Sequence, residues 1–137
     1  MINGKSVISI MPARAGSKGL PGKNIKHLGG IPLISWSIKQ ALSSSFIDLV
    51  LVSTDCSEIA SVALNYGAEV PFVRPEHLAT DEASTFDVIK HSLDYYSAQA
   101  RLFDYVVLME PTSPLRMPQD IDNMISMLES NAQEFDS

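Results

Sequence analysis

The amino-acid sequence predicts an α/β protein in which a mainly parallel sheet lies between two layers of helices, a Rossmann-like three-layer α/β/α arrangement. Two observations support this fold class. Short apolar runs rich in β-branched residues alternate along the chain with segments whose apolar residues recur at helical spacing. The strand-like runs are also apolar throughout, as in strands buried on both faces, and strands connected by helices form parallel sheets with right-handed crossovers.

The apolar runs predict four strands. The first is VISIM at residues 7–11, a buried strand bounded by Gly4 and Pro12. The others are predicted at residues 48–53 (DLVLVS), 70–73 and 105–109 (YVVLM).

Helical periodicity predicts four helices between and after these strands. The first covers residues 32–45, with Pro32 suited to its first turn. We expect Asp55 to cap the second helix and Gly67 to end it. The apolar faces of the last three helices are Ile59, Val62, Ala63 and Tyr66; Phe86, Ile89, Leu93 and Tyr96; and Ile121, Met124, Ile125 and Leu128.

Composition predicts one ordered domain over residues 1–137. The chain is 45% hydrophobic and 19% charged, and it contains no linker or repeat. It has no apolar run long enough to span a bilayer and no recognisable signal peptide, and its single cysteine, Cys56, excludes an internal disulfide. We therefore expect a soluble cytoplasmic protein with no membrane partner.

Charge is distributed unevenly along the chain. Residues 1–47 hold six Lys or Arg and no acid, whereas the remaining residues hold four bases and sixteen acids. A basic region in a protein of net charge −6 indicates a local anion site, because an acidic surface opposes non-specific binding to nucleic acid. The predicted ligand is small and phosphorylated.

A glycine-rich basic loop directly follows the first predicted strand. Ligands of α/β sheets bind beyond the carboxyl ends of the strands, and glycines allow backbone amides to approach phosphate oxygens. In this loop Arg14 can hold two phosphate oxygens with its planar guanidinium, and Lys23 adds a charge that can follow departing pyrophosphate. The sequence MPARAGSKGLPGKN at 11–24 therefore predicts a nucleotide-phosphate site.

The loop matches neither common nucleotide-binding motif. A Walker A loop has four residues between its glycines and a Ser or Thr after its lysine. Here five residues separate Gly16 from Gly22, Asn24 follows Lys23, and no GxGxxG is present. The spacing therefore argues against both a P-loop ATPase and a Rossmann dehydrogenase.

Residues 14–24, reading R-x-G-S-K-G-x-P-x-K-N, resemble the signature of the acylneuraminate cytidylyltransferase family in the nucleotidyltransferase-A superfamily. The resemblance continues, in order, with IPLISW (31–36), VSTD (52–55), RPEHLATDEAST (74–85) and LMEPTSPLR (108–116). It implies a fold of the nucleotide-diphospho-sugar transferase type that lacks its C-terminal portion. It also predicts an exposed sheet edge or apolar patch where that portion packs.

The resemblance also implies roles for individual residues. Arg14 and Lys23 are the candidate catalytic residues, through stabilisation of phosphate charge. The implied triphosphate ligands are Arg14, Gly16, Ser17, Lys18 and Lys23; the implied cytosine and ribose contacts are Asn24, Arg74, Ala83 and Thr85; and the implied sugar contacts are Glu110, Thr112, Ser113 and Arg116.

Several of these residues have alternative interpretations. Arg74 is also compatible with a surface position after a strand, and Arg116 with an ion pair rather than substrate binding. Glu110 stands where many members of the family carry Gln. It is compatible with a sugar contact, a Mg²⁺ ligand or a plain strand-end acid. The main metal ligands are expected in the portion that the resemblance implies is missing.

The implied reaction is attack by the anomeric hydroxyl of a sialic-type nonulosonic acid on the α-phosphate of CTP, with Mg²⁺ as cofactor and pyrophosphate as leaving group. The implied full-length enzyme is a homodimer or higher homo-oligomer. Two alternatives remain open: a related nucleotidyltransferase for Kdo, pseudaminic or legionaminic acid, and a truncated, non-catalytic nucleotide-binding module. The sequence does not decide which sugar acid is used, nor CTP against GTP.

Overall fold

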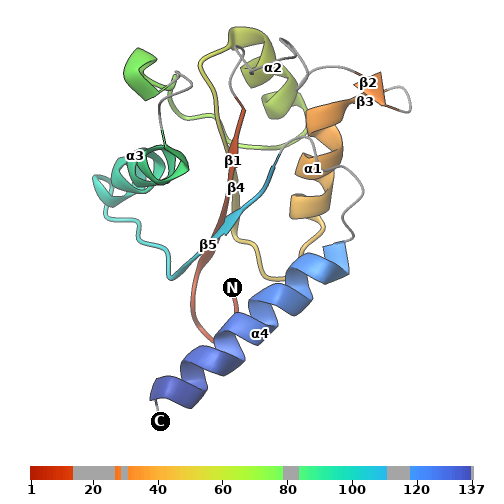
Figure 1. Cartoon of the computed structure of the whole chain (residues 1–137). Coiled ribbons are helices and arrows are strands. Elements are labelled where there is room, and N and C mark those ends of the chain that lie inside the picture. Colours follow the sequence, from red (N-terminus) through yellow and green to blue (C-terminus); the bar gives the residue numbers. More distant parts are fainter. Residues whose placement is uncertain (14–26, 29–30, 79–83, 111–117, 137) are drawn as a thin grey trace.

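The computed structural model describes residues 1–13, 27–28, 31–78, 84–110 and 118–136 (Figure 1). Its central sheet has three parallel strands, β1 (Val7–Pro12), β4 (Leu49–Ser53) and β5 (Tyr105–Leu108), in the order β4-β1-β5. In this register Ile8 pairs with both Leu49 and Val106. Strands β2 (His27–Leu28) and β3 (Ile31–Pro32) form a separate antiparallel pair.

Helices cover both faces of this sheet. Helices α1 (Leu33–Leu42), α2 (Ser57–Asn65) and α4 (Pro118–Asp136) contribute to one core cluster, and α3 (Thr85–Ser97) contributes to the other. Figure 1 shows α3 on one side of the strands and α1 and α4 on the other. The predicted three-layer parallel α/β/α class is therefore confirmed.

Alternation along the strands separates the two core clusters. In β1, Val7 and Met11 belong to the cluster with α1, α2 and α4, whereas Ile8 and Ile10 belong to the cluster with α3. All five residues of β4 are buried. Apolar residues at every position of such strands are what burial on both faces requires.

The prediction of a strand at residues 70–73 is wrong. Only Glu69 pairs with β4 here, in an isolated parallel bridge to Leu51 in which its N–H donates to Val50 at 2.8 Å and its carbonyl accepts from Val52 at 3.0 Å. Pro71 lacks the N–H that a longer ladder needs. The segment instead packs Val70 and Phe72 against opposite faces of the sheet.

The predicted cap of α2 is also wrong by one residue. The N-cap is Cys56, whose side chain makes no capping hydrogen bond, while Thr54 Oγ1 accepts a 3.1 Å bond from the Cys56 N–H. The other end follows the prediction, because Gly67 takes a φ of +100° just after the helix. Positive φ is a conformation that glycine adopts without strain.

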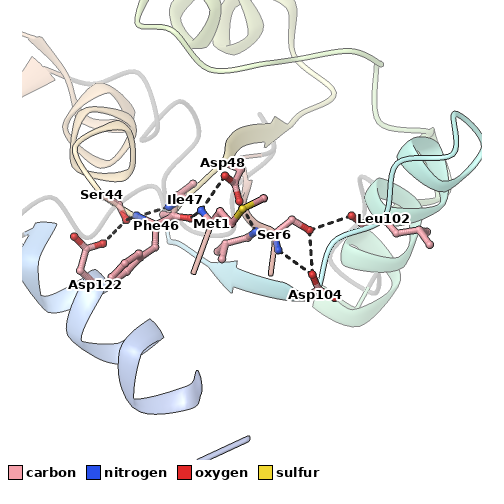
Figure 2. Close-up of polar contacts among 10 residues, drawn as sticks. Met1, Ser6, Ser44, Phe46, Ile47, Asp48, Leu102, Asp104 and Asp122 are labelled. Atoms are coloured by element: carbon pink, nitrogen blue, oxygen red, sulfur yellow. Dashed lines mark hydrogen bonds and ion pairs between the residues drawn. The ribbon is translucent and has the colours of Figure 1, made fainter. Parts of the chain in front are cut away.

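Carboxylates hold the amino end of the sheet together, as Figure 2 shows. Asp48, just before β4, accepts a 2.7 Å bond from the Val7 N–H, and Asp104, just before β5, accepts one of 2.8 Å from the Ser6 N–H. On α4, Asp122 accepts from the Ser44 hydroxyl and, at 3.0 Å, from the Ser45 N–H. These bonds fix the end of the sheet opposite to the predicted nucleotide site.

One side of α4 is apolar but exposed. Its buried stripe contains Ile121, Ile125 and Glu129, and Glu129 accepts from the Tyr105 hydroxyl and pairs with Lys5 Nζ at 3.2 Å. Beside that stripe the exposed apolar side chains are Met124, Met127 and Leu128, and Leu108 of the edge strand β5 is exposed as well. The predicted exposed edge and apolar patch are thus present in the described part of the chain.

Candidate functional site

The carboxyl ends of the three parallel strands meet at one edge of the sheet. The Ala13 N–H, after β1, donates to the Ser53 carbonyl at 2.9 Å, and the Met109 N–H, after β5, donates to the Ile10 carbonyl at 3.0 Å. Ligands of open α/β sheets bind at this edge. The glycine-rich loop predicted to bind phosphates begins directly after Ala13.

Three of the predicted site residues, Arg74, Thr85 and Glu110, lie in the described part of the chain. The others lie outside the described residues: Arg14, Gly16, Ser17, Lys18, Lys23, Asn24, Ala83, Thr112, Ser113 and Arg116.

Arg74 is buried, with 4% of its surface exposed, so the alternative of a surface position is wrong. Its guanidinium donates through Nη2 to the Ser53 carbonyl at 2.6 Å, through Nε to Ser53 Oγ at 3.1 Å, and through Nη1 to the Leu78 carbonyl at 3.3 Å. Its backbone N–H donates to the Thr54 carbonyl at 2.9 Å. Arg74 therefore joins the end of β4 to the short 3₁₀ turn η2 (Glu76–Leu78).

The Ser53 carbonyl is the shared point of this arrangement. It accepts both from the Ala13 N–H and from the Arg74 guanidinium, using the two acceptor sites of a carbonyl oxygen. Hydrogen bonds to charged groups contribute about 1.5–3 kcal/mol each. A buried cation is thus held at the sheet edge from which the predicted phosphate loop departs.

Thr85 is exposed as the first residue of α3. The helix is capped by Ser84, whose Oγ accepts a 3.0 Å bond from the Asp87 N–H. The amino end of a 13-residue helix carries partial positive charge and unpaired N–H groups, which favour anionic or polar ligands. Thr85 is therefore available for contact with a ligand.

Glu110 is exposed and lies two residues beyond the end of β5. Its carbonyl accepts a 3.3 Å bond from Ser37 Oγ, and Ser37 is buried on α1. This bond fixes the backbone at Glu110, while the carboxylate remains accessible. The bond was not predicted, although the position of Ser37 in the helix next to the loop was a usable signal.

A groove of about 570 Å³ opens beside the end of β4. The groove is lined by residues 54–57, by Ala60 and by residues 70–73. The last lining residue, Val73, directly precedes Arg74 in the sequence. This volume lies within the roughly 300–1,000 Å³ range of small-molecule sites.

The described residues do not form a metal centre. Among them no group of three or more His, Cys, Asp or Glu side chains is placed to hold an ion. Because Mg²⁺ in nucleotide sites is usually held by one or two carboxylates together with substrate phosphates and water, a role of Glu110 as a metal ligand stays a prediction. No described helix is long and apolar enough to cross a membrane.

The sequence matches one family model, described as "Cytidylyltransferase", over residues 8–137. CMP-N,N'-diacetyllegionaminic acid synthase from Legionella pneumophila is 44% identical over 121 residues, which are 88% of this chain and 52% of that protein. Pseudaminic acid cytidylyltransferase from Campylobacter jejuni is 44% identical over 79% of this chain and 47% of its own length. N-acylneuraminate cytidylyltransferase from Escherichia coli is also 44% identical, over 80% of this chain and 25% of its own.

A solved structure, CMP:2-keto-3-deoxy-manno-octonic acid synthetase complexed with CTP, superposes with a TM-score of 0.77. It is 21% identical and covers 93% of this chain and 49% of that one, so it establishes likeness of fold. The chain thus spans about half the length of the first two relatives above and a quarter of the third.

Proposed function

This chain belongs to the cytidylyltransferase family, and on that premise we propose that it is the CTP-binding part of an enzyme that activates a sialic-type nonulosonic acid. The anomeric hydroxyl of the sugar attacks the α-phosphate of CTP. A phosphorus–oxygen bond to the sugar forms, the bond to the β-phosphate breaks, and pyrophosphate leaves while the hydroxyl proton passes to solvent or a base.

The observation that carries this proposal is the position of Arg74. A buried guanidinium bonded to Ser53 lies at the carboxyl edge of the sheet, where a nucleotide is expected to bind. The described groove opens on the same segment. Both features fit a nucleotide whose base and ribose lie near Arg74 and Thr85 and whose triphosphate lies along the loop after Ala13.

Charge stabilisation supplies the catalysis in this proposal. Transfer of a nucleotidyl group concentrates negative charge on the α-phosphate and on the departing pyrophosphate, and positioned cations lower the barrier. Arg14 and Lys23 take this role, with Gly16, Ser17 and Lys18 offering further donors. Thr112, Ser113, Arg116 and Glu110 face the sugar acid.

The relatives favour a nine-carbon sugar acid as the second substrate. The three relatives compared above carry names of legionaminic, pseudaminic and N-acylneuraminic acid enzymes. The 2-keto-3-deoxy-manno-octonic acid (Kdo) synthetase is only 21% identical to this chain in the superposed part and bears on the fold alone. We also propose that Mg²⁺ binds with CTP as the counter-ion of the triphosphate. The proposed assembly of the full-length enzyme is a homo-oligomer.

The test is calorimetric titration of the chain with CTP, GTP, ATP and UTP in the presence of Mg²⁺, repeated with Arg14→Ala and Lys23→Ala. We expect selective binding of CTP and a loss of at least about tenfold in affinity for each variant, as removal of one charged hydrogen bond predicts. Lys90→Ala is the matched control, because Lys90 is exposed and pairs with Asp94 on α3.

Equal weak binding of all four nucleotides, unchanged in both variants, contradicts the loop assignment. Pyrophosphate release on addition of a sugar acid then distinguishes an active enzyme from the non-catalytic module. Selective CTP binding without release in the presence of any nonulosonic acid favours the module for this chain.

A further inference from the structure

We infer that Phe72, held by His91 and Tyr95 of α3, is a positioning residue for Arg74 and so for recognition of the nucleoside half of CTP. This inference rests on the proposed function. It concerns how the segment that carries Arg74 is held against α3, and Phe72 also lines the groove beside β4.

Phe72 is the apolar anchor of a segment without regular secondary structure. It packs against the core cluster on the α3 side of the sheet. Its ring meets the His91 ring edge-on, with centroids 4.6 Å apart and planes at 86°, and meets the Tyr95 ring at 5.2 Å and 56°. His91 and Tyr95 are one helical turn apart and share a face of α3, so together they fix the Phe72 ring.

Arg74 follows Phe72 by two residues. Its bonds to Ser53 and Leu78 need the backbone of residues 72–74 in one place, because the guanidinium has a fixed planar geometry. The Arg74 N–H bond to Thr54 and the ring contacts of Phe72 supply two points of attachment. Removing the Phe72 ring leaves the stretch between the Glu69 bridge to β4 and the Arg74 N–H without its contact to α3.

Helix α3 connects this anchor to Thr85. The helix begins at Thr85 and continues without interruption through His91 and Tyr95 to Ser97. The two described residues assigned to the nucleoside, Arg74 and Thr85, are therefore positioned by the same helix. Ala13, which precedes the predicted triphosphate loop, is bonded to β4 through the Ser53 carbonyl.

The charge state of His91 matters to this arrangement. Burial, together with nearby His77 and Arg74, lowers the pKa of His91 below its usual value, and only Asp94 acts in the opposite direction. The imidazole is therefore neutral near pH 7. Protonation places a further positive charge close to Arg74 and repels its guanidinium.

The experiment compares Phe72→Leu with Phe103→Leu by titration of the chain with CTP and with inorganic tripolyphosphate. Phe103 is the matched control, because it makes an edge-on contact with Tyr96 of the same helix, at 5.7 Å and 84°, in the same core cluster. We expect Phe72→Leu to weaken CTP binding about three- to tenfold, the loss expected for one aromatic pair. The affinity of Phe72→Leu for tripolyphosphate is expected to equal that of the wild type. Phe103→Leu is expected to bind both ligands as the wild type does and to have only a lower melting temperature.

A pH series with His91→Gln gives a second readout. As pH falls from 8 to 5.5, wild-type CTP affinity is expected to fall more steeply than that of His91→Gln, since titration of CTP itself is common to both. Equal CTP affinities of Phe72→Leu and wild type, or parallel losses of CTP and tripolyphosphate, overturn the inference. Failure of the wild type to bind CTP overturns the proposed function instead.

Discussion

Arg74 has a structural role at the sheet edge, and the proposed function gives the same side chain a binding role. Its three side-chain donors reach two acceptors on Ser53 and one on Leu78, all at the carboxyl edge of the sheet. These bonds organise the edge before any nucleotide arrives. A ligand that contacts the same guanidinium therefore meets a cation already fixed in place, which lowers the entropy lost on binding.

Arg74→Lys is expected to lower the free energy of unfolding by about 1–3 kcal/mol, because a single ammonium group cannot reach the acceptors on both Ser53 and Leu78 and leaves buried polar atoms unpaired. Chemical denaturation measures this change. Arg101→Lys is the control, since Arg101 is exposed and stacks on Tyr96 and Phe103. Equal losses for the two variants contradict the structural role of Arg74.

At the scale of elements, the connections between strands and helices determine where the site residues lie. The turn after α2 is an example, because Gly67 reverses the chain with φ +100° and leads Glu69 back to the edge of β4. A Cβ at Gly67 would lie 3.1 Å from Leu42 Cδ1 of α1. The turn thus fixes the path of the segment that continues to Arg74.

Gly67→Ala is expected to lower the free energy of unfolding by about 1–2 kcal/mol, the cost of a left-handed conformation for a residue with a Cβ. Thermal or urea unfolding measures it. Gly4→Ala is the matched control, because Gly4 has φ +78° and a Cβ added there would meet nothing within 4 Å. Both variants lose stability because alanine is strained at positive φ. Gly67→Ala is expected to lose more, because its Cβ also crowds Leu42. A smaller loss at Gly67 than at Gly4 argues against the packing contribution of Leu42.

At the scale of the whole molecule, the exposed side of α4 is an apolar surface made by Met124, Met127 and Leu128. Asp122 and its partner Ser44 place α1 on one flank of α4, and Met124 and Leu128 project from the other flank. We propose that further polypeptide packs there in a full-length enzyme, since the chain spans about half the length of its legionaminic and pseudaminic acid relatives.

This surface predicts self-association of the isolated chain at high concentration, because large exposed apolar patches bind one another. Met127→Lys, at a side chain that is 66% exposed, is expected to shift the equilibrium toward monomer without altering CTP affinity. Analytical ultracentrifugation measures the change. Leu64→Lys on α2, which is 57% exposed, is the control, and an equal shift in that variant excludes α4 as the interface.

Much of this protein was predictable from local sequence. Apolar runs such as VISIM and LVLVS determine buried parallel strands because every position of such a strand faces a helix layer. The glycine at the end of α2 is a local signal as well, since the positive φ there constrains the residue type. The phosphate role of the loop motif at 14–24 stays a prediction, because the loop lies outside the described residues. The resemblance to cytidylyltransferases, carried by segments in order, was confirmed by the family match over residues 8–137.

The tertiary structure decided features that depend on residues far apart in the chain. The apolar run at 70–73 does not form a strand, because Pro71 cannot continue the ladder, and Phe72 packs against His91 and Tyr95 of α3. Arg74 is buried because Ser53 and Leu78 converge on it, which no local pattern contains. The sequence by itself thus determined the fold class and family through short-range regularities, whereas burial, shared hydrogen bonds and the exposed face of α4 depended on contacts made only in three dimensions.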